Sequence, residues 1–525
     1  MRLRYAALLA LASDASAQCG AAANARLFDT PAISASVLPT GTLFYPDTEG
    51  KHFLVKDANG QPLGETVYTA GLWVAGNVGS ELRASGETYL GNNVSYTPGP
   101  LSASGQPYAD NCDRYNRVWI VTLDDQIQYD AFGTLTDDMR TWPYQAGAPV
   151  RDGDGVAGNY NLAGGDRPMI WGAATAWYVL NDVAYHSFPG TTGLGLEVQV
   201  TVGTLGYSLP GGLVVRHRLV YKPSQNVPLT DTFVGMWNDV DLGVASDDYI
   251  ATDSTLSMIY TYNADNADEG NGGFGSANLP AQGVQLLQGP RVDTDGNGTK
   301  ETVLRATSGR LLDKNQNNQN MYEPRTPQEY RYVLDARWRD GTPVTIGNRG
   351  YGGTVPTRWA FSGMPPNYWT EDQLTPGATL SPPGDRRGVV ASGPFTMQPG
   401  ETQDIVTAFP VAFGTDRIDA VRNLKAYAAS LLNAYPVAND TDARPGLAVA
   451  LGPNPTRGSL RGTVPAGQSA TVALYDLLGR ELHTLATLPQ GGAFTADVSE
   501  ATPGVYFVRI KQGTATAWHR LVVVR

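Results

Sequence analysis

The sequence predicts a mainly β fold, with a β-sandwich body that is either whole or split into two β-rich halves, one long helix, and a small immunoglobulin-like sandwich at the C-terminus. Three observations predict this fold. Short segments alternate apolar and polar residues with the period of two that suits a half-buried strand. The chain of 525 residues contains 60 Gly and 35 Pro, and turn signals separate these segments. Helical periodicity is scarce outside one segment near residue 420.

Composition bounds the class of protein. A chain of 525 residues is too long for a single hydrophobic core, and its hydrophobic content of 42% supports several globular cores. Charged residues make up only 17%, which suits an extracellular β-rich protein. The net charge of −12 argues against nucleic acid and anionic membranes as partners, and it is compatible with bound divalent cations.

The N-terminus has the pattern of a secretory signal peptide over residues 1–17. Arg2 and Arg4 form a basic start, Tyr5 to Ala12 is apolar, and Ala15-Ser16-Ala17 is a small-residue cleavage site. A lipoprotein signal that uses Cys19 is the alternative, although Gln18 fits a lipobox poorly. No later run approaches the ~20 apolar residues that span a bilayer. We therefore expect a soluble mature chain with no transmembrane segment.

The two cysteines, Cys19 and Cys112, both remain after signal cleavage. In an exported protein such a pair can form one disulfide. Cys19 is so close to the new N-terminus that the bond would hold a tail rather than a core. The sequence leaves this pairing open.

The body of the protein shows strand patterns on both sides of residue 225. Alternating segments are Asn116 to Leu123, Glu197 to Val202, Leu213 to Tyr221 and Thr230 to Val240. Pro223 to Pro228 predicts a boundary between a β-rich half at residues 18–225 and a second half at 226–436. Residues 261–279 and 312–330 are expected to be long polar loops.

One helix is predicted from Asp416 to Ala434. Thr415 can cap its start, and Asp416 and Asp419 in the first turn complement the helix dipole. Its apolar stripe follows helical spacing and consists of Ile418, Val421, Leu424, Ala428, Leu431 and Leu432. Pro436 ends the helix, and the polar residues 437–446 are the expected linker.

Residues 447–525 predict a separate all-β module. Val472 and Leu474 share a face of one strand, and Tyr506, Val508 and Ile510 share a face of another. The strands are expected at Ala470 to Asp476, Val505 to Lys511 and Trp518 to Val524. This spacing predicts a sandwich of about seven strands, immunoglobulin-like in size.

This module resembles the type A sorting domain of the type IX secretion system of Bacteroidota. Three motifs and a closing segment carry the resemblance in the family's order. They are Pro453-Asn454-Pro455; Leu474 to Arg480, which includes Tyr475, Asp476, Gly479 and Arg480; Pro503 to Ile510, which includes Gly504 and Tyr506; and the closing Arg520 to Val524. Family members commonly end in a lysine-bearing stretch, whereas this chain ends at Arg525.

The resemblance implies a route out of the cell. The signal peptide would take the chain into the periplasm, and the type IX machinery would take it across the outer membrane. The tail is often then removed, and the remaining protein, here called the passenger (residues 18–436), is secreted or attached to lipopolysaccharide on the outer cell surface. An ordinary terminal immunoglobulin-like domain is the alternative, because fold pattern alone does not imply function.

The passenger also resembles a group of uncharacterised secreted proteins with the same tail. Three segments carry this resemblance: Ala70 to Gly76, Arg117-Val118-Trp119, and Thr230 to Gly243. The group has no activity to carry over.

The sharpest local motif runs from Asp293 to Glu301. Asp293, Asp295, Asn297 and Glu301 occupy positions one, three, five and nine, and oxygen ligands at alternate positions between glycines suit calcium. Position twelve is Leu304, so this is not an EF-hand. A solvated turn rich in Asp and Asn is the alternative.

Two further acidic segments have more than one interpretation. Asp152-Gly153-Asp154-Gly155 lacks further acidic ligands nearby and is expected to be a plain turn. Asp239 and Asp241 would share one face of a strand, where paired carboxylates can do acid–base work on a glycosidic bond. They and the neighbouring Asp247, Asp248 and Asp253 can equally bind calcium or lie in a solvated loop.

Other catalytic patterns are missing from the sequence. It contains no G-x-S-x-G and no H-E-x-x-H, and His52, His186 and His217 have no supporting spacing. The aromatic stretches Trp171 to Tyr178 and Tyr351 to Trp369 could stack on glycans, although such strands usually pack a core. The sequence therefore favours a non-enzymatic binding or surface protein, with a polysaccharide-degrading hydrolase and a structural component of an extracellular layer as alternatives.

Overall fold

The computed structural model describes most of the chain. The described residues are 25–45, 52–89, 95–186, 189–205, 211–313, 318–347, 349–363, 369–371, 382–434, 450–452, 456–475, 481–501, 504–512 and 515–523. The expected signal peptide, Cys19 and the linker at 437–446 lie outside these ranges. The chain divides into two compact units, of which the smaller comprises residues 434–525 and 206–211.

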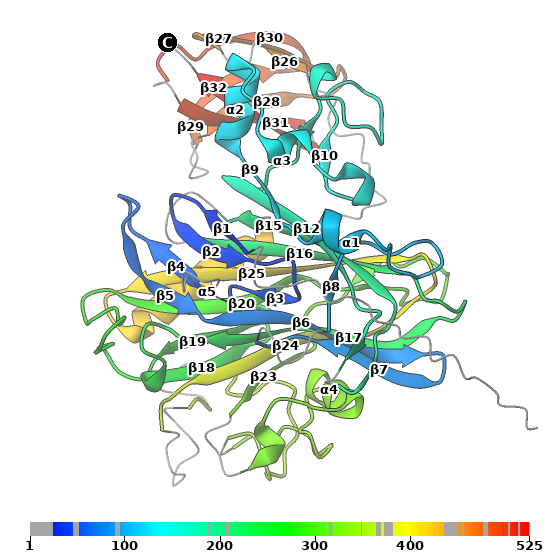
Figure 1. Cartoon of the computed structure of the whole chain (residues 1–525). Coiled ribbons are helices and arrows are strands. Elements are labelled where there is room, and N and C mark those ends of the chain that lie inside the picture. Colours follow the sequence, from blue (N-terminus) through cyan, green and yellow to red (C-terminus); the bar gives the residue numbers. More distant parts are fainter. Residues whose placement is uncertain are drawn as a thin grey trace, which may run out of the picture. The chain divides into compact units, whose positions relative to one another are not determined.

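The larger unit contains two large antiparallel sheets (Figure 1). The ten-stranded sheet has the order β23-β24-β17-β6-β3-β2-β4-β5, with β1 on β2 and β7 on β6. Its strands are β1 (Arg26–Asp29), β2 (Ile33–Val37), β3 (Thr42–Leu43), β4 (Phe53–Lys56), β5 (Pro62–Val67), β6 (Thr69–Val78), β7 (Glu81–Gly86), β17 (Leu229–Val240), β23 (Ser308–Leu312) and β24 (Arg386–Met397).

The nine-stranded sheet has the order β18-β19-β20-β25-β16-β15-β12-β8, with β9 on β12. Its strands are β8 (Thr97–Pro98), β9 (Trp119–Thr122), β12 (Ala174–Asn181), β15 (Leu196–Thr204), β16 (Gly211–Tyr221), β18 (Asp248–Asp253), β19 (Met258–Asn263), β20 (Leu279–Gln288) and β25 (Thr402–Gly414). Short two-stranded ladders join β10 (Val150–Arg151) to β11 (Arg167–Pro168), β13 (Tyr185–His186) to β14 (Thr191–Thr192), and β21 (Arg291–Val292) to β22 (Thr302–Val303).

The boundary expected near residue 225 does not divide the passenger into two bodies. Pro223 to Pro228 connects β16 of the nine-stranded sheet to β17 of the ten-stranded sheet. Strands from both sides of this connection then pair with one another, β6 with β17 and β16 with β25. The proline-rich segment therefore marks a crossover between sheets within one unit.

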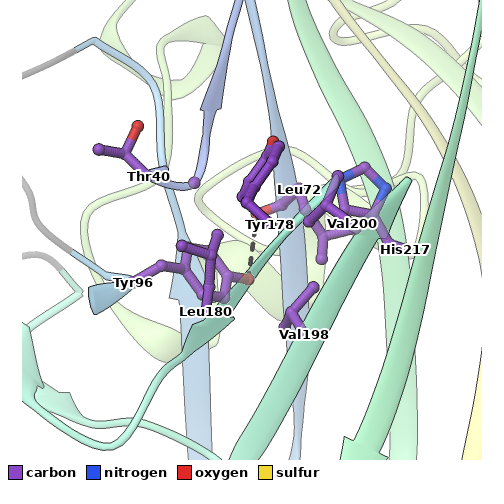
Figure 2. A pocket seen from close by; sticks show the side chains of 9 residues that line it. Thr40, Leu72, Tyr96, Tyr178, Leu180, Val198, Val200 and His217 are labelled. Carbon is purple, nitrogen blue, oxygen red and sulfur yellow. Dashed lines mark hydrogen bonds between the residues drawn. The ribbon is translucent and has the colours of Figure 1, made fainter. Parts of the chain in front are cut away.

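The long strands are buried on both faces, and each face meets a different layer. In β6, Leu72 lines the space between the sheets together with Tyr178, Leu180 and Val198 of the other sheet, as Figure 2 shows. The next residue, Trp73, is also buried but belongs to a cluster on the opposite face. A period of two thus separates the contacts between sheets from the contacts with outer layers.

Helices form part of those outer layers. Tyr330, Val333 and Leu334 of α4 (Pro327–Leu334) pack on Trp73 and Trp237, whose stacked rings have centroids 5.9 Å apart. On the nine-stranded sheet, Val421, Leu424 and Ala428 of α5 (Arg417–Ala434) pack in a cluster with residues of β19 and β20. Because these helices cover the outer faces, the strands beneath them can be apolar throughout.

The predicted helix at 416–434 starts one residue later than expected, and its cap differs. Oδ1 of Asp416 accepts hydrogen bonds from the backbone nitrogens of Ile418 (2.9 Å) and Asp419 (2.8 Å). Thr415 instead donates through its Oγ1 to Asp419 Oδ2 at 3.2 Å. The side chain that caps the helix is therefore that of Asp416, not Thr415.

Four shorter helices were not predicted: α1 (Asn111–Tyr115), α2 (Leu123–Phe132), α3 (Asp137–Arg140) and α4. Single 3₁₀ turns occur at η2 (Tyr144–Ala146), η3 (Leu162–Gly164), η4 (Ala245–Asp247) and η5 (Gln319–Met321). Among the described residues, no helix is long and apolar enough to cross a membrane.

The smaller unit contains seven described strands in two sheets. A three-stranded sheet has the order β26-β27-β30, and a four-stranded sheet has the order β29-β28-β31-β32. The strands are β26 (Ala450–Gly452), β27 (Ser459–Val464), β28 (Ala470–Tyr475), β29 (Glu481–Leu488), β30 (Gly492–Asp497), β31 (Gly504–Gln512) and β32 (Ala515–Val523). Val472, Leu474, Val508 and Ile510 lie in its core as their alternation predicts. The mainly β fold class is therefore confirmed.

Candidate functional site

The described sorting-motif residues lie in the four-stranded sheet of the smaller unit. Tyr475 ends β28, is 5% exposed, and has the guanidinium carbon of Arg509 4.7 Å from its ring centroid. Gly504 begins β31, and Tyr506 in the same strand is a core residue. The other motif residues lie outside the described ranges; they are Pro453, Asn454, Pro455, Asp476, Gly479 and Arg480.

In the larger unit, the structure brings Asp239 and Asp241 together with a third carboxylate. Asp239 is the next-to-last residue of β17, Asp241 follows the end of that strand, and Asp385 directly precedes β24. One oxygen from each of the three lies within 4.8 Å of the others. We call this group the aspartate cluster. Asp385 could not be found from sequence, because it lies more than 140 residues away along the chain.

Arg387 and Tyr89 complete the surroundings of Asp239. The Tyr89 hydroxyl donates to Asp239 Oδ2 at 2.5 Å, and Arg387 Nε donates to the Tyr89 oxygen at 2.6 Å. The Arg387 guanidinium also forms ion pairs with Asp239 (3.3 Å), Asp385 (2.8 Å) and Glu323 (3.4 Å). The Arg387 guanidinium thus contacts the Tyr89 hydroxyl and the carboxylates of Asp239, Asp385 and Glu323.

Burial sets the protonation of these carboxyl groups. It raises the pKa of Asp239 to about 8, while the guanidinium of Arg387 acts in the opposite direction. Burial, and next the charge of Asp385, raise the pKa of Asp241 to about 6. A carboxyl group with a raised pKa near neutral pH is suited to donate a proton.

The other three aspartates of the predicted acidic segment have separate roles. Asp248 is fully buried, and its Oδ2 accepts from the Leu242 nitrogen at 3.1 Å. Asp247 lies in η4, where burial raises its pKa to about 6. Asp253 forms an ion pair with Lys425 of α5 at 2.9 Å. None of the three belongs to the aspartate cluster.

The loop at 293–301 brings three of its four predicted ligands together. Asp293, Asp295 and Glu301 each place an oxygen within 4.8 Å of the others. Both oxygens of Asp293 accept backbone hydrogen bonds, from Gly296 and Gly298 at 2.7 Å. Asn297 donates from its side chain to Asp295 and accepts from the Thr299 nitrogen. The loop thus has the hydrogen bonds of a turn rich in Asp and Asn.

The segment Asp152 to Gly155 has an acidic neighbour that the sequence did not indicate. One carboxylate oxygen from each of Asp152, Asp154 and Asp166 lies within 4.8 Å of the others. The expectation that further acidic ligands are lacking was therefore wrong. Asp166 is 0% exposed, and its two oxygens accept from the backbone nitrogens of Gly153 and Asn161. These bonds account for the burial of its charge.

The three passenger histidines do not come together. His52 is stacked on Tyr68, with ring centroids 4.2 Å apart. Both ring nitrogens of His186 lie within 3.3 Å of backbone carbonyl oxygens. His217 faces the space between the two sheets, and burial lowers its pKa to about 3 (Figure 2). That space does not admit a water-sized sphere, so we assign His217 to the core.

A cavity of about 530 Å³ lies on the outer side of the nine-stranded sheet. It is lined by Pro100, Leu101, Tyr108, Arg114, Tyr115, Tyr144, Gln145, Ala146, Gly147, Glu197, Gln199 and Lys222, and we call it the tyrosine cavity. Glu197 and Gln199 alternate along β15 with Val198 and Val200, which face the other sheet. Tyr108 is 50% exposed.

Polar groups are held in place within the tyrosine cavity. Glu197 Oε2 accepts from the Lys222 ammonium at 2.6 Å and from the Leu101 nitrogen at 2.8 Å. Gln199 donates to the other oxygen of Glu197 at 2.9 Å. Sequence reasoning missed this cavity because its residues come from distant segments. The predicted aromatic stretch Trp171 to Tyr178 instead places Trp177 and Tyr178 in the core.

Comparison with known proteins identifies the smaller unit. Residues 451–524 match the family described as the secretion system C-terminal sorting domain. These residues are therefore a sorting tail of the type IX secretion system, as predicted. The match is confined to the tail, and no curated protein matches the chain.

A solved structure described as a polysaccharide lyase matches the chain with 8% identity and a TM-score of 0.22. The match covers 95% of this chain and 46% of that protein, so the chain spans less than half of its length. This degree of likeness carries no argument about the passenger.

Proposed function

We propose that this chain is a surface or secreted binding protein for polysaccharides, delivered by its type IX sorting tail. The tail supports export to the cell surface or into the medium, and it implies contact with the secretion machinery. The passenger is the functional part, and the tyrosine cavity is its binding site. Attachment to lipopolysaccharide and calcium binding by the loop at 293–301 stay predictions.

The observation that carries the proposal is the combination of groups in the tyrosine cavity. Tyr108 and Tyr144 offer aromatic rings for the apolar faces of sugars, while Gln145 and Gln199 offer amide groups for hydroxyls. A volume of about 530 Å³ lies within the range of small-molecule binding sites. These features favour binding of a short stretch of glycan.

The test is affinity electrophoresis of the purified full chain through gels that contain single polysaccharides. We expect retardation by at least one polysaccharide, and Tyr108→Ala and Tyr144→Ala should each weaken the affinity about threefold to tenfold. Phe132→Ala is the matched control, because Phe132 is 75% exposed and does not line the cavity. Retardation that both tyrosine variants leave unchanged would refute this site.

A hydrolase is the second candidate. The observation that favours it is that Asp239 and Asp241 lie together and have raised pKa values, as the acid of a carboxylate pair requires. Mass spectrometry of the soluble sugars would show shortened products, and Asp239→Asn and Asp241→Asn would abolish them. Activity that survives both substitutions would remove this candidate.

A structural role in an extracellular layer stays a prediction, which self-association in sedimentation would support.

A further inference from the structure

The geometry points to a calcium site formed by Asp239, Asp241 and Asp385 in the aspartate cluster. This inference goes beyond polysaccharide binding, because the tyrosine cavity shares no residue with the cluster. The sequence left calcium binding open as one interpretation of Asp239 and Asp241. The structure adds Asp385, which directly precedes β24, as a third ligand.

The spacing of the three carboxylates fits one ion. Calcium takes carboxylate oxygens at 2.3–2.6 Å, so two oxygens on opposite sides of one ion lie about 5 Å apart. One oxygen from each of Asp239, Asp241 and Asp385 lies within 4.8 Å of the other two. A single calcium ion can therefore contact all three without a change in the backbone.

A buried oxygen of Asp239 points to a ligand. Asp239 is only 2% exposed, and its Oδ2 is taken by Tyr89 and Arg387. Its Oδ1 has no hydrogen-bond partner within the described part of the chain. Leaving such a group unsatisfied is unfavourable, more so where it is charged, and a cation would satisfy it.

The carboxylates of the cluster lie close to one another. Arg387 pairs with Asp239, Asp385 and Glu323, and Asp241 lies beside Asp239 and Asp385. Ionised carboxylates at this separation repel one another, and a divalent cation between them would reduce that repulsion.

The ligand set favours calcium over other metals. All three ligands are carboxylates, which suit calcium and magnesium rather than zinc or copper. The Asp385 side chain is 38% exposed, so water can complete the coordination from that side. Calcium accepts such irregular sets of six to eight oxygens, whereas magnesium demands near-octahedral geometry.

The acidic groups that contain Asp293 and Asp166 differ from the aspartate cluster in their hydrogen bonds. Both oxygens of Asp293 and both oxygens of Asp166 already accept backbone hydrogen bonds. A metal at either group would have to compete with these bonds. The aspartate cluster instead has an unsatisfied buried oxygen, and this distinction makes a matched control possible.

Terbium luminescence tests the site directly. Terbium replaces calcium at oxygen sites and emits when a nearby aromatic ring is excited. The Tyr89 hydroxyl lies 2.5 Å from Asp239 Oδ2, and the ring centroids of Tyr89 and Trp237 are 5.3 Å apart. We expect the full chain, stripped with a chelator, to give terbium emission that calcium displaces.

Two variants of the cluster and one control variant show whether the terbium emission comes from the aspartate cluster. Asp241→Asn and Asp385→Asn should each lower terbium affinity at least tenfold, while Asp293→Asn should leave it unchanged. Asp385 is the variant least able to disturb folding because its side chain is partly exposed, and circular dichroism in chelator would verify both folds. The proposal fails if the full chain gives no calcium-displaced emission, if either cluster variant binds as tightly as the parent, or if Asp293→Asn alone abolishes binding.

Discussion

At the scale of single residues, Glu87 is an unusual carboxyl group because it is buried and forms no ion pair with any described residue. It is 3% exposed, Oε2 accepts from the Ser95 nitrogen at 2.9 Å, and Oε1 has no hydrogen-bond partner in the described ranges. Burial raises the pKa of Glu87 from 4.5 to about 8. The folded protein therefore holds a proton on Glu87 at neutral pH.

This raised pKa predicts a pH dependence of stability. Between pH 4.5 and about 8 the folded state binds a proton that the unfolded state has lost, so the contribution is present below pH 4.5 and is lost as pH rises toward 8. Glu87→Gln should remove this slope, which is at most about 1.4 kcal/mol per pH unit. Urea unfolding at pH 5 and pH 8.5 measures it. The exposed Glu81→Gln is the control, and equal slopes in parent and Glu87→Gln would contradict the assignment.

A buried ion pair predicts a second residue-scale effect. Arg386 Nε lies 3.0 Å from Glu371 Oε1, with side chains 1% and 0% exposed, and Glu371 also accepts from the Ile250 nitrogen. Glu371→Gln removes the counter-charge that lies 3.0 Å from the guanidinium and should lower the free energy of unfolding by about 3–5 kcal/mol. Thermal and urea unfolding would measure it.

The control for that prediction is the exposed pair Arg140 and Asp137, whose side chains are 63% and 58% exposed. Asp137→Asn should change stability by less than about 1 kcal/mol. If Glu371→Gln lowers the free energy of unfolding no more than this control does, the prediction for the buried pair is wrong.

Sequence reasoning found two of the three members of the aspartate cluster. The pair Asp239 and Asp241 could be predicted from the sequence because spacing along one strand is a local property. Asp385, Tyr89 and Arg387 join them only through the pairing of β17 with β24 and the packing of the segment after β7. No local pattern encodes such contacts, and the residues of the tyrosine cavity escaped prediction for the same reason.

At the scale of elements, close approach of β6 to a neighbouring chain segment requires glycine at position 71. A Cβ at Gly71 would lie 2.3 Å from the backbone oxygen of Glu87, which is closer than real contacts allow. Gly71→Ala should therefore destabilise the larger unit by about 1–3 kcal/mol. Gly452→Ala is the control, because its Cβ would meet nothing within 4 Å. Equal unfolding curves for both variants would contradict the prediction.

Strands were predicted better than helices, and the reason is visible in α2 and α4. Period-two alternation located β15, β16 and β17 to within two residues. The missed helix α2 carries start and stop signals, a capping box between Thr122 and Asp125 and a left-handed Gly133. Its composition is polar, and its side chains give little amphipathic pattern, so periodicity alone could not reveal it. The first half of α4, Pro327 to Tyr330, lies in the segment 312–330 that its polar composition assigned to a loop.

At the scale of the whole molecule, the sequence predicted the tail and not the architecture of the passenger. The tail carries its identity in short motifs, and residues 451–524 confirm it. The passenger's two sheets are built from strands that alternate between them along the chain, so a proline-rich crossover at 223–228 resembled a domain boundary. The pairing of β6 with β17 and of β16 with β25 corrects that interpretation.

The central claim is that the tail directs export of the passenger across the outer membrane, and cell fractionation tests it most directly. The full chain and a chain that stops at residue 446 would be expressed in a bacterium that has the type IX machinery. The account predicts the full chain in the medium or on the protease-accessible cell surface, and the shortened chain in the periplasm. Equal export of both chains, or export of the full chain from a strain that lacks the machinery, would contradict it.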